Sequence, residues 1–125
     1  MGEPEGRLVG LHHVQLAMPE GEEAAATHFY QDVLGLDRIE KPAQLAPRGG
    51  VWFRSGELEV HLGVEEGFRP AVKAHPAFLV RDLDSVRRRL DEGGYKVVDT
   101  VQLDGYERFY VRDPFGNRLE MIEPE

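Results

Sequence analysis

Apolar and polar positions alternate along several short segments of the chain, and between them apolar residues recur with helical spacing. The segment 11–18 alternates as a half-buried strand does. Over 22–34 the apolar residues fall on one helical stripe, and Gly35 stands where a helix commonly ends. Three more strands are expected over 36–40, 50–54 and 58–64. The stripe consists of Ala26, Phe29, Tyr30, Val33 and Leu34.

The second half of the chain repeats this order of elements. A strand is expected over 76–80, and Asp82 can cap a helix whose apolar positions are Leu83, Val86 and Leu90. Strands over 95–101, 108–112 and 118–122 follow, the last two joined by a turn at 113–117. The pattern predicts an α+β fold of two βαβββ modules, about 8–65 and 74–124. Because half the chain would bury too little surface alone, residues 1–125 are expected to form a single domain.

Four side chains that can bind a metal fall on the strand faces opposite the apolar ones. In the strand over 58–64, Val60 and Leu62 share one face and His61 lies on the other. The four occupy equivalent places, because each module contributes one from its first strand and one from its last. If the modules pair about an approximate twofold axis, these side chains converge on one divalent ion. The candidate ligands are His13, His61, His75 and Glu120.

Two further histidines receive a different interpretation. His12 shares a face with Val14 and Leu16 and is predicted to pack in the core, whereas His28 is predicted to lie on the surface of the first helix.

Composition excludes several classes of function. There is no cysteine, so disulfides, thiolate nucleophiles and thiolate metal sites are ruled out. The net charge of −8 opposes non-specific binding to nucleic acid. No apolar run approaches the roughly 20 residues of a membrane span, and the start does not resemble a secretory signal. We expect a cytoplasmic protein that binds neither nucleic acid nor membrane.

Three motifs make the chain resemble the vicinal oxygen chelate superfamily. They are Leu-His-His-Val at 11–14, Phe-Tyr-Gln-Asp-Val-Leu-Gly-Leu at 29–36, and Asp-Pro-Phe-Gly-Asn-Arg-Leu-Glu at 113–120. This superfamily includes glyoxalase I, fosfomycin-resistance proteins, methylmalonyl-CoA epimerase, extradiol dioxygenases and bleomycin-resistance proteins. The resemblance implies a glyoxalase-like fold, in which the two modules form a curved mixed sheet around a metal and ligand cavity.

The resemblance also implies a metal site built from the same four residues, with one Zn, Ni, Mn or Fe ion per site. Glyoxalase I enzymes have an acid or amide where this chain has His61, and fosfomycin-resistance proteins usually have a threonine where it has Gln15. The family chemistry is chelation of a substrate through adjacent oxygens. Glu120 would be a ligand and, once displaced by substrate, a catalytic base.

Around this site, five residues are candidates for binding a small-molecule substrate: Gln15, Glu59, Trp52, Arg108 and Tyr110. Three functions remain open. The chain is a metal-dependent isomerase, lyase or transferase of glyoxalase type, an Fe(II) extradiol-type dioxygenase, or a metal-free ligand-binding protein like those of bleomycin resistance. A homodimer is expected, because two-module chains of this superfamily commonly pair and some share ligands between copies.

Overall fold

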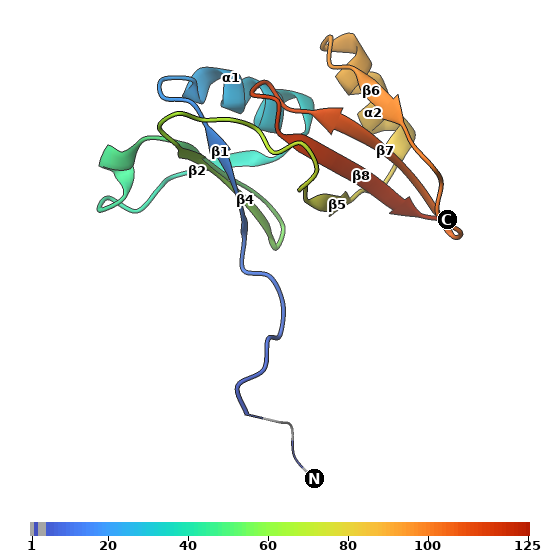
Figure 1. Cartoon of the computed structure of the whole chain (residues 1–125), viewed down its shortest axis with the longest axis horizontal. Coiled ribbons are helices and arrows are strands. Elements are labelled where there is room, and N and C mark those ends of the chain that lie inside the picture. Colours follow the sequence, from blue (N-terminus) through green and yellow to red (C-terminus); the bar gives the residue numbers. More distant parts are fainter. Residues whose placement is uncertain (1, 3–4) are drawn as a thin grey trace.

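The first module forms a four-stranded mixed sheet in the strand order β1-β4-β3-β2. The computed structural model describes residue 2 and residues 5–125 (Figure 1). β1 runs parallel to β4, while β4 with β3 and β3 with β2 are antiparallel. The strands are β1 (Val14–Met18), β2 (Asp37–Ile39), β3 (Val51–Ser55) and β4 (Leu58–Val64).

The second module repeats this topology in the order β5-β8-β7-β6, again with one parallel pair, β5 with β8. Its strands are β5 (Ala77–Leu79), β6 (Val97–Asp99), β7 (Tyr106–Arg112) and β8 (Arg118–Pro124). The predicted α+β fold of two βαβββ modules is therefore confirmed. The two sheets remain separate in the described chain, so one continuous curved sheet is not formed within a single copy.

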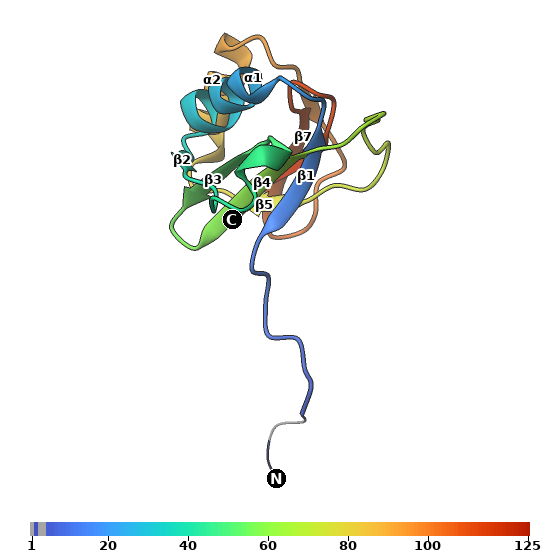
Figure 2. The same cartoon turned by 90° about the vertical axis from the view of Figure 1, so that its left-hand side faces the viewer.

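Both helices lie on the same side of the sheets (Figure 2). The sequence predicts one regular helix over 22–34, but α1 (Glu23–Thr27) continues as a π-helical segment, η1 (His28–Val33), and a 3₁₀ turn, η2 (Ala46–Arg48), follows β2. The wider π turn, closed by the Leu34 amide on the Phe29 carbonyl at 2.9 Å, accommodates one extra residue. α2 (Leu83–Glu92) begins at the predicted cap, since the Asp82 carboxylate accepts from the Ser85 amide.

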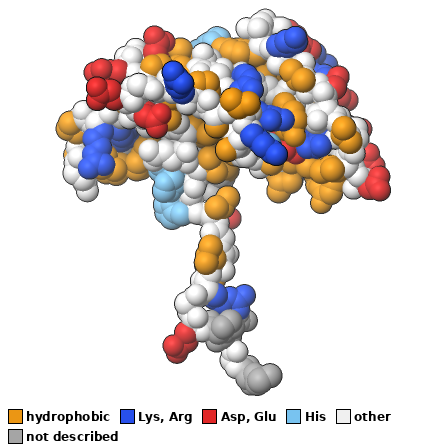
Figure 3. All heavy atoms as spheres, viewed as in Figure 1, with side chains coloured by type: hydrophobic (Ala, Val, Ile, Leu, Met, Phe, Trp, Pro, Cys, Tyr) orange, Lys and Arg blue, Asp and Glu red, His pale blue; other side chains and the backbone are white. Residues whose placement is uncertain are grey.

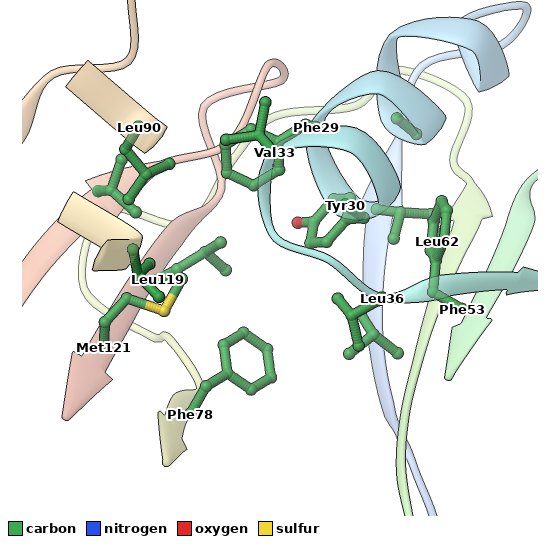
Figure 4. Close-up of a cluster of buried hydrophobic side chains, with 14 of the residues drawn as sticks. Phe29, Tyr30, Val33, Leu36, Phe53, Leu62, Phe78, Leu90, Leu119 and Met121 are labelled. Atoms are coloured by element: carbon green, nitrogen blue, oxygen red, sulfur yellow. The ribbon is translucent and has the colours of Figure 1, made fainter. Parts of the chain in front are cut away.

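The apolar side chains of η1 lie between the two modules. Phe29, Tyr30 and Val33 are buried, and they belong to one cluster with residues of both sheets, such as Leu62 and Leu119 (Figure 4). The helical stripe therefore fills the core between modules, as the 3.6-residue period predicts.

Residues 5–13, which precede β1, extend away from the body of the protein (Figures 1 and 2). Over 5–13 no helix or strand forms, and Leu8, Val9 and Leu11 are almost fully exposed. β1 thus begins at Val14, three residues later than predicted. Among the described residues, no helix has the length and apolar character that crossing a membrane requires.

Candidate metal centre

His75 and Glu120 form a preassembled pair at the start of the second sheet. Nε2 of His75 lies 2.9 Å from Oε1 of Glu120, whose side chain is buried. On the other edge of the ring, Nδ1 lies 2.7 Å from the carbonyl oxygen of Lys73. A carbonyl oxygen can only accept, so Nδ1 carries a proton and donates it. In the neutral ring, the lone pair of Nε2 then faces a carboxylate oxygen, an arrangement that needs a proton or a cation between the two atoms.

The second oxygen of Glu120 is held by an arginine from the neighbouring strand. Arg108 Nη1 lies 3.3 Å from Oε2 of Glu120 and 3.1 Å from the Tyr110 hydroxyl, while Nε and Nη2 donate to the carbonyl of Val101. Burial acts to lower the pKa of Arg108, but the hydrogen bonds to Glu120 and Tyr110 reverse the direction and raise it. Arg108 therefore orients the carboxylate and keeps a positive charge beside it.

His61 lies inside the first sheet, in a stack of rings. Its ring is 3.7 Å from that of Trp52 at an angle of 2°, and its side chain is only 4% exposed. Nε2 of His61 donates to Glu59 at 3.0 Å, and Glu59 also accepts from Arg54 at 3.1 Å. Burial lowers the pKa of His61, and the hydrogen bonds from His61 and Arg54 lower the pKa of Glu59.

His13 covers the other face of the His61 ring. The two ring centroids are 4.1 Å apart and the planes are inclined by 18°. Nδ1 of His13 lies 2.9 Å from Nδ1 of His12, so one of them donates to the other. The prediction that His12 packs in the core is wrong, since it is exposed; alternation fails there because the strand begins only at Val14. His28 is exposed as predicted.

The four candidate ligands therefore meet as two pairs, one in each module. His13 contacts His61, and His75 contacts Glu120. Within the described part of one chain, no three or more histidines, aspartates or glutamates lie close enough together to hold a metal ion. The expected convergence of all four within a single copy is not found. Histidine atoms appear on the surface where the N-terminal segment leaves the body (Figure 3).

A groove of about 310 Å³ runs beside β1 and the segment that connects the modules, and it reaches His75. Gln15 and His75 line it, together with Phe68 and Arg118. The Gln15 amide lies over Gly63, where an added Cβ would come within 2.5 Å of its nitrogen. Gly63 thus leaves the space that the Gln15 side chain occupies.

Two residues that contact the predicted site residues Glu59 and Tyr110 were not predicted from the sequence. Arg54 stands opposite Glu59 in the β3–β4 hairpin, and the guanidinium of Arg118 lies 3.9 Å from the centre of the Tyr110 ring. The tight turn between β3 and β4 sets the register of the hairpin. From that register one could have predicted that Arg54 lies opposite Glu59 and Trp52 opposite His61.

The family model described as "Glyoxalase/Bleomycin resistance protein/Dioxygenase superfamily" matches residues 10–121. A glyoxalase family protein from Bacillus anthracis is 43% identical, with a TM-score of 0.92, covering 98% of this chain and 100% of that one. No curated protein sequence matches.

Two more distant structures share the fold. A glyoxalase/dioxygenase from Nostoc punctiforme is 22% identical with a TM-score of 0.79, covering 100% of this chain and 97% of the other. The fosfomycin resistance protein FosX from Listeria monocytogenes is 16% identical with a TM-score of 0.75, covering 95% of this chain and 96% of FosX.

Proposed function

The chain belongs to the Glyoxalase/Bleomycin resistance protein/Dioxygenase superfamily, and on that premise we propose that it is a metal-dependent enzyme of glyoxalase type. Its substrate is a small molecule chelated through two adjacent oxygens. The observation that carries the proposal is the pair formed by His75 and Glu120. Because Lys73 fixes the proton on Nδ1 of His75, the free lone pair of Nε2 and a carboxylate oxygen are aimed at the same point.

The donor set fits a divalent ion. Two donors that each bind an ion at about 2.1 Å lie roughly 3 Å apart when their bonds are at right angles. Nε2 of His75 and Oε1 of Glu120 are 2.9 Å apart. An imidazole and a carboxylate also suit Zn, Ni, Mn and Fe, and the hydrogen bonds from Arg108 and to Lys73 are the outer contacts that hold such ligands.

We propose that a second copy of the chain completes the site. β1 and β5 are both edge strands, and each pairs with only one other strand in the described chain. His13 directly precedes β1 and His75 lies shortly before β5, so each pair has one member beside a sheet edge. In a twofold dimer, His13 of one copy meets His75 and Glu120 of the other, and two equivalent sites form. This arrangement accounts for the absence of a three-ligand group within the described residues of one copy.

A divalent ion bound there supplies Lewis-acid stabilisation of a developing oxyanion. Residues of the chain orient the ligands, accept the proton and bind the substrate. Arg108 holds the Glu120 carboxylate in its orientation through a hydrogen bond, and this carboxylate would accept a proton from the substrate. The side-chain amide of Gln15 has no hydrogen-bond partner among the described residues. It is therefore free to hold a substrate oxygen.

Mixing two inactive variants tests the proposal. His13→Ala removes the ligand from the first module but keeps His75 and Glu120. A double variant, His75→Ala with Glu120→Gln, removes the ligands of the second module but keeps His13. We expect both homodimers to have lost tight zinc binding and a heterodimer purified with two different tags to recover one of its two sites. The readouts are bound zinc and dimer mass.

Three outcomes would contradict the proposal. Wild-type protein without metal affinity would favour a metal-free binding protein. No recovery in the heterodimer would place the site within one copy. Bound iron with oxygen uptake on catechols would favour the dioxygenase. His28→Ala, at an exposed histidine outside the site, is the control.

A further inference from the structure

His61 is the most enclosed of the three stacked rings in the first sheet. Trp52 covers one of its faces at 3.7 Å and His13 covers the other at 4.1 Å. The Trp52 contact follows from the hairpin, in which these two residues stand directly opposite each other. The His61 ring is therefore clamped from both sides, whereas His13 is exposed.

The edge of the His61 ring is fixed as well. Nε2 donates to Glu59 at 3.0 Å, and Arg54 holds the same carboxylate from the other side. Releasing this nitrogen for a metal would break a hydrogen bond and leave the Glu59 carboxylate with Arg54 alone. A ring held by two faces and one edge has lost the freedom that a ligand needs to turn toward an ion.

The angle between the rings also separates the roles of His13 and His61. An imidazole binds a metal through a lone pair in the plane of its ring, at about 2.1 Å. An ion shared by both rings must lie in both planes. For face-to-face rings, two planes inclined by 18° with centroids 4.1 Å apart intersect only at roughly 13 Å from the rings, far beyond the reach of a metal–nitrogen bond of about 2.1 Å. The stacked rings therefore cannot both bind one ion.

We infer that His61 is not a ligand but a positioning residue, which holds the imidazole of His13 in the orientation that binds the metal. This inference rests on the metal site of the proposed function. The stack with His61 sets the plane of the His13 ring, and the contact with His12 engages Nδ1 of His13. When Nδ1 of His13 is the donor in this contact, Nε2 of His13 carries the lone pair that would bind the ion.

A double-mutant cycle on zinc affinity tests the inference in the full-length protein. His61→Ala should weaken zinc binding by about 10- to 100-fold, the usual effect of losing a contact that orients a ligand. His61→Phe keeps the stack without a nitrogen and should bind within about threefold of wild type. When His13 is already alanine, His61→Ala should cause no further loss, because His61 acts only through His13.

The inference is overturned if His61→Phe binds zinc as weakly as His61→Ala, or if the losses of His13→Ala and His61→Ala add. Either result makes His61 a ligand and leaves the proposed metal function intact. Near-ultraviolet circular dichroism checks that each variant is folded.

Proton NMR of the metal-free protein keeps this test separate from the proposed function. In the wild type, the stack should shift the ring C–H signals of His13 upfield. This upfield shift should remain in His61→Phe and disappear in His61→Ala. Equal spectra for both variants would show that His61 does not orient His13. If wild-type protein binds no zinc, the proposed function fails, whereas the NMR comparison still decides whether His61 positions His13.

Discussion

The hydroxyl of Tyr30 donates a hydrogen bond of 2.7 Å to Oδ2 of Asp113, joining η1 of the first module to the β7–β8 turn of the second. Both side chains are buried. Asn117 donates to the same carboxylate and to the carbonyl of Ala17 in β1, at 2.9 and 2.8 Å. This network ties the two modules of one chain together and limits how far they can rotate against each other.

Removing the hydroxyl should destabilise the fold. In Tyr30→Phe, Oδ2 of Asp113 loses one of its two side-chain donors while remaining buried. We expect the free energy of unfolding to fall by about 1–3 kcal/mol, measured by urea denaturation. Tyr106→Phe, at a partly exposed tyrosine outside the network, should change it by less than about 0.5 kcal/mol. Equal effects of the two variants would argue against the link between modules.

The buried carboxyl group should also make stability depend on pH. Burial raises the pKa of Asp113, although the donors around it, Tyr30 and Asn117 among them, pull the other way. The folded state then binds this proton more tightly than the unfolded chain, whose aspartate pKa is about 3.9. The stability of wild type relative to Asp113→Asn should therefore increase as pH falls from about 7 to 4. A relative stability that decreases over that interval would mean that the donors outweigh burial.

Arg108 should act on metal binding through Glu120. Arg108→Met removes the hydrogen bond to Oε2 of Glu120 and the positive charge beside it, while keeping much of the side-chain length. We expect zinc affinity to fall by about 10- to 100-fold in equilibrium titrations. Arg88→Met, which alters an exposed arginine on α2, should have no effect. An unchanged affinity in Arg108→Met would leave Arg108 without a role in orienting the ligand.

Gly50 should tolerate no side chain. Its φ is +85°, and an added Cβ would lie 2.2 Å from the backbone oxygen of Leu62, which cannot move without disturbing β4. We expect Gly50→Ala to cost more than about 3 kcal/mol in chemical denaturation. Gly56 also has positive φ but open space around it, so Gly56→Ala should cost only about 1–2 kcal/mol. Similar costs at the two positions would show that strain in φ, rather than the clash, decides.

Where the signals are local, prediction from the sequence succeeded. β4 has the predicted bounds, and Val60 and Leu62 are buried on its core face. Asp82 caps α2 as expected. These features depend on residues a few positions apart, whose alternation or capping chemistry does not change with the rest of the fold.

Prediction failed where neighbours distant in sequence intervene. The π-helical segment from His28 to Val33 looks like ordinary helix in the pattern. Phe29 and Tyr30 are buried, as the predicted stripe requires, but nothing in the pattern predicts the wider turn that the Leu34 amide closes on the Phe29 carbonyl. His12 was misassigned because alternation was extended beyond the first residue that has a strand partner.

The sequence by itself determined which faces of the strands carry imidazoles and carboxylates, because side chains in a strand alternate with a period of two. Only the tertiary structure decided how these faces meet. Each pair forms inside one module, because β1 pairs with β4 and β5 pairs with β8. His75 thus faces Glu120, 45 positions along the chain, and His13 stacks on His61, 48 positions along. Whether the two pairs meet depends on the relative rotation of the two modules, which the packing between them sets. Alternation carries no information about that rotation, so the sequence alone could not separate one site with four ligands from two pairs.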